Sequence, residues 1–269
     1  MEDGRLVPLP IPETDPCRSI PYENLCFDNR SYLDLLQSLY PNKDFTHTAA
    51  HVDPDIVRPV LPRHHAWRGI FGQAWAAAGH LREQAVDAGD LFLFWGRFRE
   101  TTRGKNGTVM FARARPLHVV FGYLQVETVL SDPLQAITAG SPPTAVTWAP
   151  GFPHFQQRSL RPTGHERVFI ARPTLSFAPD RPGWGVFKWR DALRLSDPDS
   201  QGVSHWRLPA CFDQVELSYN PRTTARNWRR NGEHVHFTAA SRGQEFVCEM
   251  TPSVRAWAED LIVSSTSWA

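Results

Sequence analysis

A chain of 269 residues is long enough for one large domain or two small ones. Hydrophobic residues make up 41% and charged residues 21%, as in ordinary globular proteins, and the net charge of +1 excludes an overall electrostatic preference for a polyanion. No apolar run approaches the roughly 18 residues of a membrane-spanning helix, and no signal peptide is recognisable. We therefore expect a cytoplasmic protein with no membrane partner.

The first half of the chain predicts two helices and two long strands. Residues 31–40 predict a short helix with Ser31 as its N-cap, and residues 66–85 predict a longer helix on which Gln73 and His80 share one face. Residues 90–98 and 118–130 are rich in β-branched and aromatic residues, which indicates strands. Between them, Asn106–Gly107 indicates a tight hairpin.

The second half predicts mostly strands and turns, followed by a terminal helix. Residues 166–177 are typical of a strand pair, residues 183–189 of a further strand, and residues 233–240 with 244–250 of a late hairpin. Residues 252–263 predict an amphipathic helix with Pro252 near its first turn. These elements favour an α+β fold with a mixed or antiparallel sheet, or a small PUA-like barrel with flanking helices. We expect one domain over residues 1–269, with at most a weak boundary near 131–145, where the sequence is loop-like.

Seven segments in one order resemble the nucleotide modification associated domain 3 family: residues 3–13, 51–56, 71–81, 89–99, 118–126, 205–212 and 242–250. The resemblance covers nearly the whole chain and implies a link to genes that modify DNA bases, although it leaves the reaction open. Members of the family usually carry a further strand and a glycine-rich stretch before the first segment. Because Met1 stands only two residues before Asp3, we expect either an incorrectly assigned start or a missing part of the site.

One motif places a histidine beside two carboxylates. His51, Asp53 and Asp55 stand at alternate positions around Pro54, in what we expect to be a loop. Such a group can bind a metal, act as a general base, or stabilise an oxocarbenium ion at a sugar C1′. Asp-Pro-Asp is also a common turn former, so a purely structural role is the alternative. We take His51, Asp53 and Asp55 as the catalytic candidates.

Amide, imidazole and aromatic side chains are the candidates for contact with a base. Amides can hydrogen-bond the edge of a base, and aromatic rings can stack on a base that has been flipped out of the duplex. Core packing or a structural histidine is the alternative at each position. The candidates are Gln73, His80, Trp95, His118, Tyr123 and His154, with Phe98 and Trp148 as further aromatic residues.

Two basic runs are candidates for the nucleic-acid backbone. Six basic residues and one acidic residue lie between Arg97 and Arg115, which gives this segment a net charge of +5. Such a ribbon would bind phosphates with salt-sensitive affinity, although charge runs are usually solvated faces. The candidates are Arg97, Arg99, Arg103, Lys105 and Arg113 in the first run, and Arg226, Arg229 and Arg230 in the second.

Metal ligands are not predicted. None of the four cysteines forms a CxxC pair, and no acidic residue stands at ligand spacing beside His64–His65, although Glu233 flanks His234 and His236. We expect no metal and no cofactor.

These observations predict a DNA-associated protein that recognises or processes modified or damaged bases, with a duplex carrying an altered base as its partner. The favoured hypothesis is a base-flipping, glycosylase-like hydrolase. The alternative is a non-catalytic reader of modified bases in a DNA modification or defence system.

Overall fold

A computed structural model describes residues 3–14, 19–131, 152–155, 166–213, 215–218, 229–239 and 245–268. The described residues contain antiparallel sheets and three α-helices, so the prediction of an α+β fold with an antiparallel sheet is confirmed. The sheets of the described residues form no closed barrel. No helix among the described residues is long and apolar enough to span a membrane.

The central sheet is organised by one long strand, β10 (Leu117–Ser131). Its first part pairs with β7 (Leu91–Phe98) on one side and with β12 (Trp184–Val186) on the other. Its last residues, from Val126 to Ser131, pair with β11 (Glu166–Ala171), with an irregularity between Val126 and Thr128. Strand β11 in turn pairs with β6 (Ile70–Ala74). One strand thus links all the others in this sheet.

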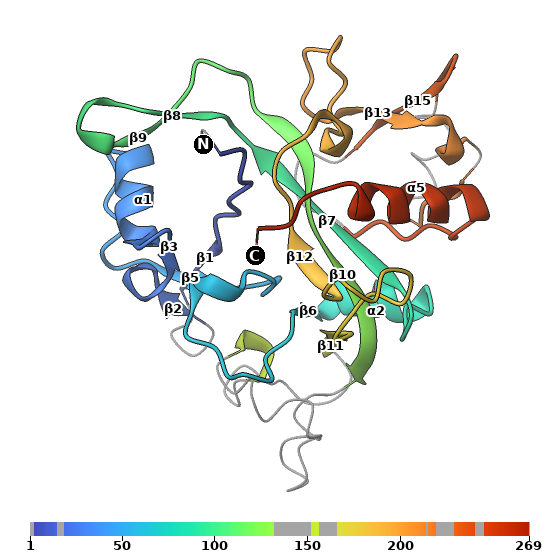
Figure 1. Cartoon of the computed structure of the whole chain (residues 1–269), viewed down its shortest axis with the longest axis horizontal. Helices are drawn as coiled ribbons and strands as arrows, with labels where there is room; N and C mark the ends of the chain where they lie inside the picture. Colours follow the sequence, from blue (N-terminus) through green and yellow to red (C-terminus); the bar gives the residue numbers. More distant parts are fainter. Residues whose placement is uncertain are drawn as a thin grey trace, which may run out of the picture.

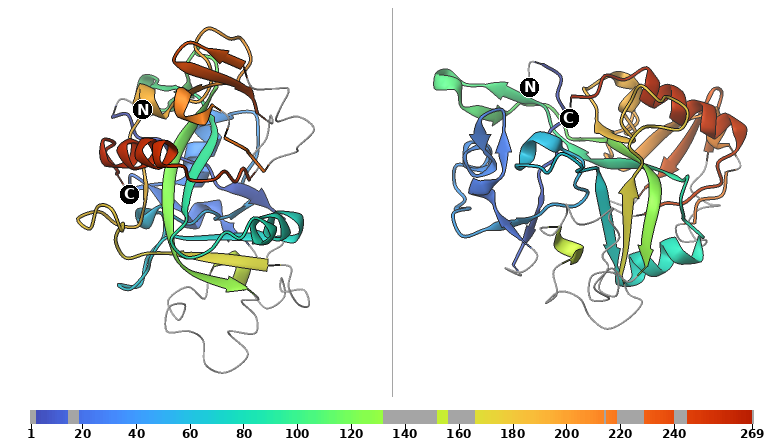
Figure 2. Two further views of the ribbon diagram at one scale, coloured as in Figure 1. Left: turned by 90° about the vertical axis from the view of Figure 1, so that its right-hand side faces the viewer. Right: turned by 60° about the horizontal axis from the view of Figure 1, so that its bottom comes forward.

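The smaller sheets and turns flank this sheet on two sides. The N-terminal segment with α1 lies on one side of β7 and β10, and β13, β15 and α5 lie on the other (Figures 1 and 2). The small sheets are β1 (Ile11–Glu13) with β5 (Ala49–His51) and β2 (Ile20–Pro21), β3 (Cys26–Phe27) with β4 (Arg30–Ser31), β8 (Thr101–Arg103) with β9 (Val109–Phe111), and β13 (His205–Pro209) with β15 (His234–Thr238) and β14 (Arg229–Asn231). Short 3₁₀ helices are η1 (Tyr22–Asn24), η2 (Arg58–Val60), η3 (Lys105–Gly107), η4 (Pro153–Phe155), η5 (Asp191–Leu193) and η6 (Ala210–Phe212).

Two helices and one hairpin form where local signals predict them. In α1 (Tyr32–Leu39) the Ser31 hydroxyl accepts a hydrogen bond from the Asp34 amide at 3.0 Å, as an N-cap does. Helix α5 (Pro252–Val263) has the predicted bounds and is capped by Thr251. The turn between β8 and β9 contains Asn106–Gly107, and both residues have a positive φ. These predictions are confirmed, as are the strands at 90–98 and 118–130.

The helix predicted for residues 66–85 is wrong over its first half. Residues Ile70–Ala74 form β6, and the helix α2 (Trp75–Glu83) begins only after them. Hydrogen bonding along β11 over the whole length of β6 outweighs the helical spacing of its apolar residues. Gln73 therefore lies on a strand and does not share a helix face with His80.

Two strand predictions in the second half also need correction. Residues 166–177 contain one strand, β11, and no strand pair, because the chain leaves the sheet after Ala171 and makes only an isolated bridge at Thr174. The predicted late hairpin does not form among the described residues. Strand β15 pairs with β13 and β14, while Cys248 bridges to Leu217.

Candidate functional site

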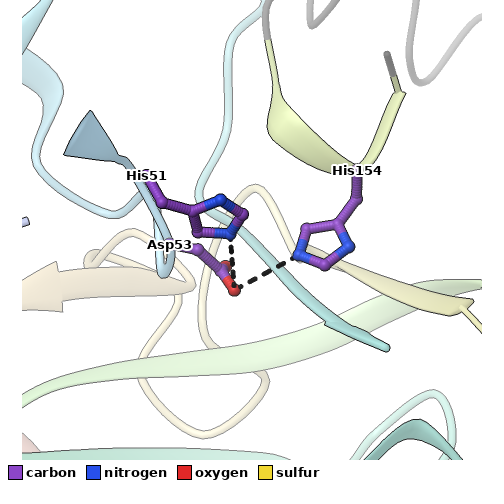
Figure 3. A group of neighbouring side chains, drawn as sticks. All are labelled: His51, Asp53 and His154. Atoms are coloured by element: carbon purple, nitrogen blue, oxygen red, sulfur yellow. Dashed lines mark ion pairs between the residues drawn. The ribbon is translucent and has the colours of Figure 1, made fainter. Parts of the chain in front are cut away.

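Three side chains predicted as site residues meet around the carboxylate of Asp53. The Oδ2 atom of Asp53 lies 3.5 Å from Nε2 of His154 and 3.9 Å from Nε2 of His51. Its Oδ1 atom accepts a hydrogen bond from the backbone amide of Gly72 at 2.9 Å. Both imidazole rings point an Nε2 atom at the same carboxylate oxygen (Figure 3).

The chain brings these residues together through an extended segment that follows β5. Strand β5 ends at His51, and two residues after Asp53 the backbone of Asp55 exchanges two hydrogen bonds with Ile70 at the start of β6. This pairing places Asp53 beside Gly72. A Cβ atom at Gly72 would lie 2.2 Å from the ring of His154, so only glycine allows His154 to pack against the strand.

Two further carboxylates stand behind the histidines. Oε2 of Glu13 lies 3.9 Å from Nδ1 of His51, and Oε2 of Glu166 lies 3.9 Å from Nδ1 of His154. Burial acts to lower the pKa of His154, but the interactions with the carboxylates of Asp53 and Glu166 outweigh it and raise the pKa to about 9. Sequence reasoning missed both glutamates, because neither lies near His51 or His154 in a recognisable motif.

Asp55, the second carboxylate of the motif, is held in a buried ion pair. Both of its oxygens accept hydrogen bonds from the guanidinium group of Arg63, which also lies 4.5 Å above the ring of Trp67. Burial raises the pKa of Asp55 to about 6, although the charge of Arg63 opposes this shift. This arrangement stabilises the loop and leaves Asp53 as the carboxylate of the motif that faces the histidines.

Asp53 also lines a cavity of about 1130 Å³. The cavity lies between the N-terminal segment, α1, the loop that carries Asp53, and the region from Trp95 to Leu117. Arg97, Arg99 and Arg115 contribute to its wall. Arg99 donates to the carbonyl of Ala112 and Arg115 to that of Pro198, whereas Arg97 is exposed and makes no hydrogen bond or ion pair with the described residues.

The six residues predicted to contact a base do not form one group. His154 lies beside Asp53, and the partly buried Trp95 lines the cavity. His80 hydrogen-bonds through Nε2 to the Ser218 hydroxyl at 2.8 Å, while the buried Tyr123 donates to the carbonyl of Pro182 at 3.1 Å. Gln73 lies opposite Arg167 in the ladder between β6 and β11.

His118, the sixth, is buried in an aromatic cluster. Its Nδ1 accepts a hydrogen bond from the indole of Trp206 at 2.9 Å, and its ring centre lies 4.7 Å from that of Trp95. Burial and the charge of Arg97 lower its pKa to about 4. The neutral ring is therefore the form that the folded state accommodates.

This pKa predicts a stability that depends on pH. Between the ordinary value of 6.5 and about 4, the unfolded chain binds a proton at His118 that the folded chain does not. Stability should be complete above pH 6.5 and fall as the pH drops toward 4, by about 2 kcal/mol between pH 7 and pH 5 from this group alone. Urea unfolding of wild type and His118→Asn measures this, and the variant should lack that part of the pH dependence. Parallel pH profiles for the two proteins would contradict the prediction.

The remaining basic candidates lie in two places: at the β8–β9 hairpin, and in or before β14, where part of the chain is outside the described residues. Arg103 and Arg113 are exposed on and just after the β8–β9 hairpin, and Lys105 begins η3 in its turn. Arg229 and Arg230 lie in β14. Arg226 and the aromatic candidate Trp148 lie outside the described residues.

The comparisons with known proteins give one result. Residues 1–249 match the model of the family described as nucleotide modification associated domain 3. No curated protein and no solved structure matches the chain.

Proposed function

Since the chain belongs to the nucleotide modification associated domain 3 family, we propose that it hydrolyses the bond between an altered base and its sugar in DNA. The observation that carries the proposal is the position of Asp53. This carboxylate lies where the histidine cluster meets the cavity. A negatively charged group beside a cavity with basic walls is what this reaction needs, because positive charge develops on the sugar while phosphates must be held nearby.

The dimensions of the cavity support a flipped nucleotide as its occupant. Ligand cavities usually measure about 300–1,000 Å³, so 1130 Å³ is sufficient for one nucleotide. A base in a duplex must leave the stack before an enzyme can act on it. In this proposal Trp95 supplies a surface against which the base can stack, and Arg97 binds a neighbouring phosphate.

In this proposal Asp53 has two roles: it stabilises positive charge on the sugar, and it acts as a general base. As the bond between C1′ and the base nitrogen breaks, its electron pair leaves with the base and positive charge develops on the sugar ring. The Asp53 carboxylate stabilises that charge and accepts a proton from the water that attacks C1′. Asp55 is less suited to this role because Arg63 binds both of its oxygens.

A reader of modified bases without catalysis is the second candidate. The same wall residues favour it, since Trp95 and the exposed Arg97 could hold an altered base and its phosphate without any reaction. Catalysis and binding make different demands on Asp53, so one assay can separate them.

The test uses end-labelled duplexes that each carry one altered base: hypoxanthine, uracil, an oxidised purine or an alkylated purine. Each duplex is incubated with the protein, treated with hot alkali and examined for strand breaks. Breaks at one altered position, absent with Asp53→Asn, are the expected result. A retained gel shift without breaks would favour the reader, and neither breaks nor binding would overturn both candidates.

Binding of the duplex should depend on the exposed arginines at the end of β7 and in or next to the β8–β9 hairpin. Replacing Arg97, Arg103 and Arg113 together by alanine removes about three phosphate contacts, so the slope of log K against log salt should become shallower by roughly two to three. Fluorescence anisotropy at several salt concentrations measures this slope. Arg255→Ala is a suitable control, because Arg255 is exposed on α5 and lies outside the cavity lining. An unchanged slope in the triple variant would remove these three arginines from the interface.

A further inference from the structure

We propose that His51, Asp53 and His154 form a binding site for a divalent transition-metal ion of the zinc or manganese type. The inference goes beyond the proposed function, because an ion can bind here whether or not the protein releases a base. It also departs from the sequence-based expectation of no metal, since His154 stands about a hundred residues from the other two ligands.

The spacing of the three side chains fits an ion better than it fits hydrogen bonds. One ligand atom from each residue lies within 4.8 Å of the others. The separations of 3.5 Å and 3.9 Å between the imidazole nitrogens and Asp53 Oδ2 are too long for good hydrogen bonds. Ligands at about 2.0–2.2 Å from a tetrahedral ion stand about 3.3–3.6 Å apart, so the two separations at Asp53 lie within a few tenths of an ångström of those that an ion needs.

Each of the three ligands has another polar group behind it. The carboxylate of Glu13 faces the far nitrogen of His51, and that of Glu166 faces the far nitrogen of His154. The Gly72 amide holds the other oxygen of Asp53. Both carboxylates lie 3.9 Å from the imidazole nitrogens, which is beyond hydrogen-bond distance. A small approach would let each histidine donate its second nitrogen to a carboxylate, as metal-binding histidines commonly do.

The charge of the cluster also favours a cation. Glu13, Asp53 and Glu166 bring three carboxylates around two imidazoles, and the side chains of Asp53 and His154 are only 8% and 5% exposed. Several carboxylates are costly to bury together unless opposite charge accompanies them. A divalent ion at the centre of the cluster would supply two positive charges, one more than a protonated His154 does.

The kinds of ligand atom at this site favour some metal ions over others. Two imidazole nitrogens and one carboxylate suit zinc, manganese, iron and related ions, whereas calcium and magnesium prefer sites made of oxygen alone. Three protein ligands leave a position for water, as in catalytic rather than structural sites. Because Asp53 lines the cavity, such a water would face the space assigned to the substrate.

Metal binding can be measured on the full chain without nucleic acid. After treatment with EDTA and dialysis, the protein is titrated with ZnCl₂ and with MnCl₂ by isothermal calorimetry, and its melting temperature is recorded with and without each ion. We expect one ion per chain and a higher melting temperature, because an ion that binds only the folded state stabilises it. MgCl₂ should have little effect at the same concentration.

Variants assign the binding to this cluster. His51→Gln should lower the affinity at least about 100-fold, and Glu13→Gln about 10–100-fold through its effect on His51. His47→Gln is the matched control, since His47 is an exposed histidine outside the cluster. Circular dichroism establishes whether each variant is folded. If His51→Gln does not fold, Glu13→Gln still tests the site. Absence of stoichiometric binding, or binding that neither His51→Gln nor Glu13→Gln weakens, would overturn the metal site and leave the duplex assay untouched.

Discussion

Asp53→Asn is expected to reduce the rate of base release by about 10²–10⁴-fold while changing the affinity for the duplex little. The amide oxygen of asparagine can still accept the hydrogen bond from the Gly72 amide, so the loop keeps its anchor. The variant loses the negative charge and the basic oxygen that face His51 and His154. Single-turnover cleavage and a gel shift on the same labelled duplex measure the two effects separately.

The control for this variant is Asp180→Asn. Asp180 is exposed and lies outside the cavity lining, so its loss should leave both cleavage and binding unchanged. If Asp53→Asn cleaved at the wild-type rate, Asp53 could not be the group that activates water. If it lost binding and cleavage in equal measure, the carboxylate would act in recognition alone.

Arg63→Met is expected to lower the free energy of unfolding by about 3–5 kcal/mol. The substitution leaves the buried carboxylate of Asp55 without its cation and removes the contact of the guanidinium with Trp67. An uncompensated buried charge is far more destabilising than the loss of an exposed ion pair. Urea unfolding at pH 7.5, followed by tryptophan fluorescence, measures the change.

Two further variants make this result specific. Arg58→Met is a matched control, because Arg58 is exposed and lies over the same indole at 5.7 Å but takes no part in the ion pair. The double variant Asp55→Asn with Arg63→Met should be more stable than Arg63→Met alone, since the buried charge is then absent. A loss in Arg58→Met as large as that in Arg63→Met would assign the effect to the aromatic contact instead.

Local signals in the sequence were sufficient to predict two helices and one turn. Ser31 and Thr251 cap helices by hydrogen bonds to amides three residues away, and Asn106–Gly107 adopts the positive φ that its turn needs. These interactions join residues close in the chain, so the sequence itself specifies them.

The segment around Gly72 shows where such reasoning fails. Its apolar spacing fits a helix, but the residues from Ile70 to Ala74 pair with a strand almost a hundred positions later in the chain. Hydrogen bonds to a distant strand, and the close packing of His154 on Gly72, depend on the assembled sheet. No pattern within the segment indicates that it pairs with β11.

The sequence by itself determined the α+β class, the family, the terminal helices and the motif containing His51 and Asp53, because these rest on local spacing and on motifs read in order. Only the tertiary structure decided that Asp55 pairs with Arg63 and that Asp53 faces His154. It also decided which carboxylates stand behind the two histidines. The physical reason is that burial and charge at this site come from strands far apart in the chain, which meet only when β5, β6 and β11 have formed.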